Sequence, residues 1–527
     1  MVSRLDQDTA TALANIREWR NSFAPINRLP LEVLSLIPTL LSSENDVSRA
    51  CSVCRHWHRT FVQQAVLWSN LNLTIKLSNL FIKTRLERAK GFPLNITSSH
   101  QDRADVLALL APHAQQLQNL KFVFDCWSYV RKFSEATSGP LPLLHTLIIH
   151  VFDDVPFFSE GTIPPSAPLF SGAINLKHFS LITEVLPFLD CFAFPNLTTF
   201  DLSATSHEEP FPASQLLDFL EATPTLRDIR LVIQEEISLA GVLPGRIVVL
   251  PNVETFTATE ESPGYKIAAH ISCPNVRCTS LIHEHHPADT AVQEAFLNSS
   301  TWNEIPPQYM IQQIHEVVLE SITTECLMCY LSFLSPGSAA LKLGYRIIDV
   351  DEDEEDEDES RLRPMLGREY VAVFSQACQA IRNHPQLANV KRMRIQDWRA
   401  PVSSSQLKRV VMEVGQLFKS MGPLEELTLD ASDLRPYFAP FIDDHPDFDD
   451  AKRSYTYPQI KVLTIATGLR GPLEADSEAA IVEFTKFQHT KGVPLELVVF
   501  QMVEPPAGTV ERLQQWVGAV NYDQENL

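Results

Sequence analysis

The residues best suited to metal chemistry form one cluster, His283-Glu284-His285-His286. Imidazole nitrogens and carboxylate oxygens are donors that Zn²⁺ binds, so the cluster would need only one more ligand from elsewhere in the fold. A run of adjacent polar residues is also typical of a loop between two structural units. We interpret the cluster as such a polar loop and predict no metal site.

Two cysteine pairs have the CxxC spacing of many zinc sites, Cys51/Cys54 and Cys326/Cys329. The pairs lie far apart in the sequence and in apolar surroundings, which favours packing in a core over zinc binding. The total of nine cysteines is odd and thinly spread over the chain. That pattern is typical of reduced thiols, and a secreted disulfide framework is not expected.

Catalytic motifs are missing from the sequence. His315-Glu316 begins like the zinc-protease motif HExxH but lacks the second histidine. No GxxxxGK[ST], GxGxxG or GxSxG occurs, and the 17 glycines leave little material for phosphate-binding loops. We therefore predict no catalytic residues, no cofactor and no enzyme activity. A hydrolase or transferase remains an alternative without a motif behind it.

An uninterrupted acidic run extends from Asp351 to Glu359. Like charges repel, so residues 349–362 are expected to form a disordered loop, with docking of a basic partner as the alternative. The aspartates at its start have the spacing of a calcium loop. Glu354 and Ser360 occupy the places of the required glycine and bidentate glutamate, so calcium binding is not expected.

The overall charge restricts the kinds of partner. The chain of 527 residues has 43 Lys and Arg against 65 Asp and Glu, a formal net charge of −22. A phosphate backbone would repel such a chain, so nucleic acid is not an expected partner. No segment resembles a signal peptide or the roughly 20 apolar residues of a membrane span, so we expect no membrane association and a cytoplasmic and/or nuclear location.

Helical spacing marks two segments near the N-terminus. In residues 1–25, Leu13, Ile16 and Trp19 are three apart, which predicts a helix that ends before Pro25 and packs on the next segment. In residues 26–73, Pro30 suits the start of a helix, and Pro38 is expected to push Ile37 out of the α region. A second helix is expected from one further apolar series: Val47, Ala50, Cys51, Cys54, Trp57 and Phe61.

Three elements of this second segment, in order, resemble the F-box signature: Leu29-Pro30-Leu31-Glu32-Val33-Leu34, Val53-Cys54-Arg55-His56-Trp57 and Leu67-Trp68. In that family, the motif forms a small helical module that binds a Skp-type adaptor and, through it, a cullin scaffold. A module of this size cannot bury all its apolar side chains internally, which agrees with a covering partner. The alternative is an ordinary helical hairpin with a private core.

The resemblance implies a set of adaptor contacts. They are Leu29, Pro30, Val33, Leu34 and Ile37, with Val53, Cys54 and Trp57 ranked lower because these positions also serve internal packing. Pro38 departs from the family pattern, in which an aromatic or apolar helix former is common.

Further along, a unit of the form apolar-x-x-apolar-x-apolar recurs, often after a proline. Its first clear copies begin at Leu144, Leu176, Leu197, Leu226, Val253 and Val276. The intervals of 21 to 32 residues lie near the roughly 20–29 residues of leucine-rich repeats. Residues 117–505 are therefore predicted to form an irregular leucine-rich-repeat solenoid, with parallel strands on a concave face and helices outside. Residues 74–116 are expected to be a connecting helical segment, and 506–527 a cap and tail that include a capping helix over Val510–Val520.

Alternation along each predicted strand turns the residues between core positions onto the concave face. These candidates for substrate binding are Thr199, Asp201, Asp228, Arg230, Thr255, Thr257, Cys278, Ser280, Arg392 and Arg394.

The predicted fold class is α/β, a short helical module followed by a repeat domain. The hypothesis for function is a non-catalytic substrate receptor of an SCF-type ubiquitin ligase that binds a protein substrate. The alternative, motivated by Pro38, is a leucine-rich-repeat scaffold that acts without the ligase complex.

Overall fold

Short strands alternate with helices in much of the described part of the chain, and strands such as Thr146–Val151, Thr199–Ala204 and Asp228–Ile233 bury every second side chain. The computed structural model describes residues 2–285, except 38–43, 74–76, 99–103, 153–168, 184–188, 190–191, 206–209, 235–236 and 261–265. It further describes 316–323, 326–334, 340–348, 375, 378, 390–398, 412–418, 424–431, 434–438, 459–466, 475–501, 503, 505 and 508–523. The chain divides into two compact units, Met1–His207 with Asp218–Leu226 and Glu208–Leu217 with Arg227–Leu527.

The first unit begins with helices and continues as a parallel sheet. The N-terminal elements are α1 (Val2–Ser22), η1 (Pro25–Arg28), α2 (Leu31–Leu36), α3 (Glu44–Ser52), α4 (Arg55–Val62) and η3 (Ala65–Trp68). The strands are β1 (Asn70–Asn72), β2 (Leu94–Ser98), β3 (Leu117–Phe124), β4 (Thr146–Val151), β5 (His178–Thr183) and β6 (Thr199–Ala204). Each pairs in parallel with the next.

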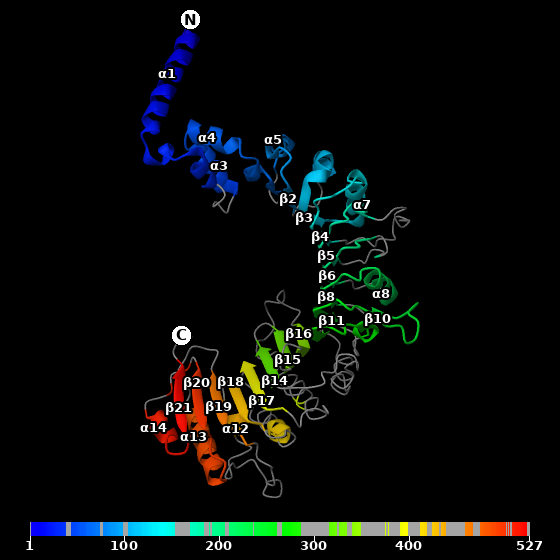
Figure 1. Cartoon of the computed structure of the whole chain (residues 1–527), viewed down its shortest axis with the longest axis vertical. Helices are drawn as coiled ribbons and strands as arrows, with labels where there is room; N and C mark the ends of the chain where they lie inside the picture. Colours follow the sequence, from blue (N-terminus) through cyan, green and yellow to red (C-terminus); the bar gives the residue numbers. More distant parts are fainter. Residues whose placement is uncertain are drawn as a thin grey trace, which may run out of the picture. The chain divides into compact units, whose positions relative to one another are not determined.

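Helices cover one face of this sheet, where the core lies. They are α5 (Asn79–Ala89), α6 (Ala104–Leu110), η4 (Ala111–Gln116), α7 (Trp127–Ala136) and α8 (Ala213–Glu221), the last shared by both units. Figure 1 shows α5 and α7 on the same side of the strands. Phe133 of α7 packs on Phe122 of β3 with ring centroids 5.0 Å apart, and Phe200 of β6 packs on Phe219 of α8 at 4.7 Å. Aromatic side chains therefore join helices to the sheet.

The segment 74–116 differs from the helical connection predicted for it. It contains strand β2, which pairs with β1 on one side and β3 on the other. Leu94, Ile96 and Ser98 are buried in alternation, a period of two that outweighs the helical character of the flanking residues. The sheet thus begins at Asn70, well before residue 117.

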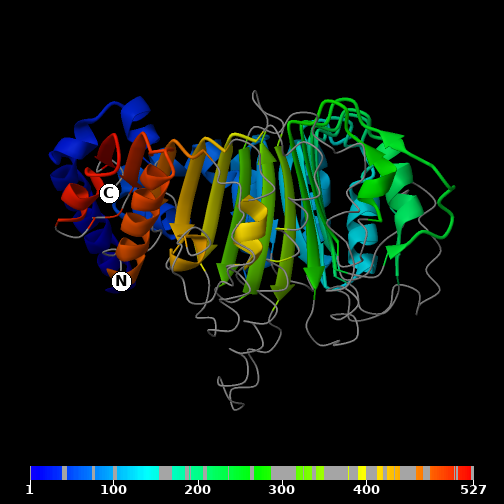
Figure 2. The same cartoon turned by 90° about the horizontal axis from the view of Figure 1, so that it is seen from below.

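The second unit contains a longer run of strands. Its described strands are β7 (Phe211–Pro212), β8 (Asp228–Ile233), β9 (Ile237–Ser238), β10 (Val248–Val249), β11 (Thr255–Glu260), β12 (Ile271–Ser272), β13 (Cys278–His285), β14 (Glu316–Thr323), β15 (Cys326–Leu334), β16 (Ala340–Ile348), β17 (Arg392–Trp398), β18 (Glu426–Ala431), β19 (Val462–Ala466), β20 (Leu497–Gln501) and β21 (Ala519–Asp523). The helices of this unit whose first and last residues the structure describes are η6 (Ala268–His270), α12 (Arg435–Phe438), α13 (Ala475–Thr490) and α14 (Thr509–Leu513). In Figure 2, the yellow to orange strands of this unit lie side by side.

An antiparallel insertion interrupts the parallel order in the second unit. Strand β13 pairs in parallel with β16, and β16, β15 and β14 then pair antiparallel before β14 pairs in parallel with β17. The strand beside β13 in the sheet is therefore β16, and not β14, which is the next strand along the chain. The acidic run and the loop predicted at 349–362 lie outside the described residues.

The C-terminal end differs from the capping helix predicted over Val510–Val520. Helix α14 ends at Leu513, and β21 pairs in parallel with β20. Gly518 permits this pairing, because a Cβ atom at this position would lie 2.8 Å from the carbonyl oxygen of Glu496. The chain thus adds one more helix and strand here.

Among the helices of the described residues, none is long and apolar enough to cross a lipid bilayer.

Candidate functional site

The N-terminal helices form a module with its own small core. Leu34 is completely buried, and Trp57 packs edge-on against the buried Phe61 with ring centroids 5.2 Å apart. The indole nitrogen of Trp57 donates a hydrogen bond to Oδ1 of Asn27 at 2.7 Å. Leu34 and Trp57 were both predicted as adaptor contacts, but their burial places them in the core of the module, where they pack beneath the surface residues.

Other predicted contacts lie at the surface of the module. Pro30, Val33 and Val53 are exposed, and Leu29, Ile37 and Cys54 are partly buried. Leu36, which sequence reasoning missed, is 60% exposed, as is Val53. Leu36 lies three residues after Val33, so helical spacing was a usable signal for it. Exposed apolar side chains on so small a module form a surface that a partner can cover.

The end of α2 differs from its prediction in one detail. Ile37 has φ −56° and ψ −50°, so it keeps helical dihedral angles although a proline comes next. The expected displacement from the α region does not occur, because the preference against α before proline is a bias that local packing can override. The helix nevertheless ends at Leu36, and Pro38 lies outside the described residues.

Leu67 and Trp68 connect the module to the sheet. Both are buried, and the indole nitrogen of Trp68 lies 3.3 Å from the carbonyl oxygen of Phe61, to which it donates a hydrogen bond. The guanidinium groups of Arg85 and Arg88 from α5 lie 5.7 and 4.7 Å from its ring centroid. Cation–π contacts of this kind fix the module against the first sheet helix.

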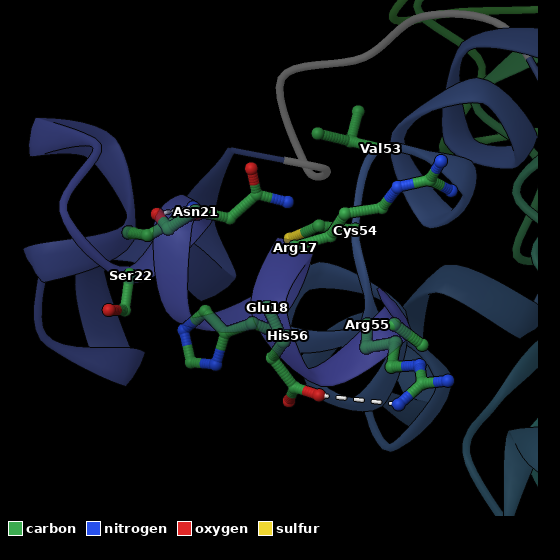
Figure 3. A pocket seen from close by; sticks show the side chains of 10 residues that line it. Arg17, Glu18, Asn21, Ser22, Val53, Cys54, Arg55 and His56 are labelled. Carbon is green, nitrogen blue, oxygen red and sulfur yellow. Dashed lines mark hydrogen bonds and ion pairs between the residues drawn. The ribbon is translucent and has the colours of Figure 1, made fainter. Parts of the chain in front are cut away.

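A cavity of about 510 Å³ is lined by residues of α1, η1 and the start of α4. Figure 3 shows Glu18 of α1 directed at Arg55 of α4. The two side chains form an ion pair with a nitrogen–oxygen distance of 3.4 Å. Glu18 also lies 3.4 Å from Arg59. Arg17 and His56 line the same cavity. Sequence reasoning had no signal for this site, because its two sides are distant in the chain.

The exposed strand face carries the predicted substrate-binding candidates. In the second unit, pairing aligns Asp228, Thr255 and Cys278 in one row and Arg230, Thr257 and Ser280 in the next. Thr255 donates a hydrogen bond to Asp228 at 2.6 Å. All six are at least partly exposed, as are Arg392 and Arg394 on β17 and Thr199 and Asp201 on β6. Arg392 forms an ion pair with Glu426 at 2.8 Å.

The first unit has an apolar patch on the same kind of strand face, which the prediction did not include. It consists of Val123, Ile148, His150, Phe152 and Ile182, all at least partly exposed. The rings of His150 and Phe152 lie 3.9 Å apart. Burial, together with the charge of Lys121, lowers the pKa of His150, which favours the neutral imidazole. The alternation of buried and partly exposed side chains in β4 was the signal that could have found part of this patch.

The candidate metal ligands lie in different settings. His283 and His285 belong to strand β13, so the polar loop predicted for the cluster is wrong. Burial raises the pKa of the Cys51 thiol, against a smaller opposing effect of Arg88, so Cys51 is held as a neutral thiol. Within the described part of the chain, no three His, Cys, Asp or Glu side chains gather as a metal site would require.

The protein is a mixed α/β chain. It begins with a small helical module that has exposed apolar side chains and continues with a sheet of mostly parallel strands. Residues 26–74 match the family model described as F-box-like, which begins within η1, ends just after β1 and identifies an F-box-like domain. No curated protein matches the chain significantly.

Proposed function

We propose that this chain is a non-catalytic substrate receptor of an SCF-type ubiquitin ligase. The F-box-like domain at residues 26–74 carries the proposal, because such domains imply binding of a Skp-type adaptor. The adaptor links the chain to a cullin scaffold, and the remaining sheet binds a protein substrate. A cytoplasmic or nuclear location accompanies this role.

The adaptor is proposed to bind the exposed apolar residues of the module. Pro30, Val33 and Leu36 lie along or just before α2, and Val53 comes directly after α3. Leu29, Ile37 and Cys54 border them. The buried Leu34 and Trp57 support this surface from inside and do not meet the adaptor directly.

The sheet is proposed to be an irregular leucine-rich-repeat solenoid that recognises the substrate. Support comes from the register, which stacks Leu120, Leu147, Phe179 and Phe200 in one buried row of consecutive parallel strands. The solenoid is proposed to begin at β1, and its last unit includes β21. The exposed strand residues are then the contact surface, and the chain acts by holding substrate lysines near the charged enzyme.

Capture of a Skp-type adaptor by the full-length chain tests the proposal. The wild type is expected to co-purify with the adaptor, and Val33→Asp with Leu36→Asp should lower capture at least tenfold, because buried carboxylates would oppose the apolar contact. Both side chains are at the surface, so the variant should fold. Leu80→Asp on α5 is the matched control, because Leu80 is exposed elsewhere, and it should capture adaptor normally.

Failure of the wild type to capture any adaptor would exclude the receptor role. A stable complex that contains neither adaptor nor cullin would instead favour the scaffold alternative.

A further inference from the structure

Helix α1 meets the rest of the module through a mostly polar face. The residues of this face that line the cavity are spaced three or four apart (Figure 3): Ala14, Arg17, Glu18 and Asn21. The apolar residues Leu13, Ile16 and Trp19 are 50%, 61% and 68% exposed. The expectation that these apolar residues pack on the next segment is therefore wrong.

Another wall of the same cavity is continuous with the proposed adaptor-binding surface. Val53, which belongs to that surface, and Cys54, which borders it, both line the cavity. Val53 is 60% exposed, so it is open to a partner. A partner that covers Val53 therefore lies directly beside the cavity and can place its own side chains against α1.

The cavity has more positive than negative groups. Among its lining residues Glu18 brings a carboxylate, whereas Arg17 and Arg55 bring guanidinium groups. Both oxygens of Glu18 already have partners, because Oε2 lies 3.4 Å from Arg55 and Oε1 lies 3.4 Å from Arg59. Within the part of the chain that the structure describes, no ion pair includes Arg17. A carboxylate from another molecule would supply the missing partner.

We propose that the cavity receives an acidic segment of the adaptor, in which an Asp or Glu side chain pairs with Arg17. This inference rests on the proposed adaptor binding and adds α1 to the binding surface. Helix α4 supports it, since Arg55–Val62 contains two arginines and two histidines but no acidic residue. A protein segment is favoured over a small anion, because Arg17 is exposed and only a partner that also covers Val53 would shield the ion pair from water.

Binding kinetics of the full-length chain on an immobilised Skp-type adaptor test the proposal. Arg17→Glu should lower the affinity about tenfold, mostly through slower association, because it reverses the charge that attracts the acidic segment. Arg17→Lys keeps the charge and should stay within about threefold of the wild type. Arg20→Glu is the matched control, because it makes the same change of charge on an exposed residue of α1 outside the cavity. It should bind like the wild type.

Two further measurements distinguish a contact with the adaptor from a structural role of Arg17. Raising the salt concentration from about 0.05 to about 0.5 M should slow the association of the wild type more than that of Arg17→Ala, because salt screens a charge pair that this variant lacks. Glu18→Gln should bind about threefold more tightly, because Arg55 and Arg59 then become available to the adaptor carboxylate. Weaker binding of Glu18→Gln would contradict the proposal, since these arginines would then serve only to hold α1.

Failure of this inference differs from failure of the receptor role. If the wild type captures no adaptor, the receptor role itself is excluded. If the wild type binds the adaptor and Val33→Asp with Leu36→Asp does not, while Arg17→Glu binds as tightly as Arg20→Glu, only the acidic contact in the cavity is overturned.

Discussion

At the scale of single residues, Glu260 is the most unusual group. It ends β11, is completely buried, and accepts hydrogen bonds from the backbone N–H groups of Ile267 at 3.3 Å and Ala268 at 3.1 Å. Burial raises its pKa from the ordinary value of 4.5 to about 7, against the smaller opposing effects of these bonds and of Lys266. The side chain therefore fastens the start of η6 to the end of a strand.

This pKa predicts a dependence of stability on pH. Between pH 4.5 and about 7 the folded chain holds a proton that the unfolded chain has released. The associated stabilisation is complete below pH 4.5 and is lost as pH rises through about 7, by on the order of 3 kcal/mol. Urea unfolding across this range should show it.

Glu260→Gln is the matched comparison, because its side chain has the same size but does not titrate. Its single amide oxygen can replace only one of the two carboxylate oxygens that accept from Ile267 and Ala268, so the two proteins are compared by how their stability changes with pH, not by its absolute value. The unfolding free energy of the wild type should fall relative to that of this variant as pH rises. Parallel pH profiles of the two proteins would show that Glu260 does not titrate in this range.

At the scale of elements, polar side chains connect successive units of the sheet. In four repeats of the pattern, the polar residue just before the first apolar residue donates a hydrogen bond to a carbonyl oxygen in the preceding repeat. The donors and acceptors are Asn175 to Pro142 at 2.8 Å, Asn196 to Ile174 at 2.8 Å, Thr225 to Pro195 at 3.2 Å, and Asn275 to Pro251 at 2.8 Å. This recurring hydrogen bond gives a physical reason for the polar residue at that position. The sequence alone shows only that the residue recurs.

Loss of one such bond should destabilise the first unit modestly. Asn196→Ala is expected to lower the unfolding free energy by about 1 kcal/mol, because the Ile174 carbonyl loses its side-chain donor. Chemical denaturation measures this change. Asn196→Asp keeps the shape of the side chain but cannot donate, so it should lose at least as much. Full stability of Asn196→Asp would show that the bond contributes nothing.

Acidic and basic residues alternate at the positions directly before successive strands of the second unit. Glu254 lies 3.4 Å from Arg227 and 3.5 Å from Arg277. Glu425 lies 3.2 Å from Lys391 and 3.9 Å from Lys461, and the hydrogen bond and charge of Lys391 lower its pKa, with a further contribution from Lys461. These charged residues come directly before neighbouring strands, where opposite charges favour this register over its alternatives.

Sequence reasoning succeeded where structure depends on local spacing. The strands around Phe179, Phe200 and Phe256 could be predicted because alternation over six residues is a local signal. The pairing of β13 with β16 could not, because no spacing rule specifies which distant strands meet. For the same reason Glu260 and the polar contact of Glu18 with Arg55 were missed: both depend on groups that only the fold brings together.

At the scale of the whole molecule, two surfaces have separate tasks in the proposed function. Val33 and Leu36 belong to the helical module, and the patch around Ile148 and Ile182 belongs to the strand face. Val33 and Leu36 do not belong to the core of the sheet, and Ile148 and Ile182 do not belong to the core of the helical module. Substitutions in one surface should therefore leave the other intact. This independence distinguishes a receptor with two separate binding surfaces from a protein with a single binding surface.

Proximity labelling of the full-length chain measures this separation. Ile148→Asp with Ile182→Asp should keep adaptor capture and lose labelled substrate proteins, because carboxylates would disrupt an apolar contact surface. Val33→Asp with Leu36→Asp should show the reverse, and its substrates should accumulate, because the adaptor no longer delivers them to the ligase. If the strand-face variant labels the same proteins as the wild type, that face does not bind the substrate. If both variants lose both kinds of partner, the two surfaces are not independent, and a single interface must then account for all binding.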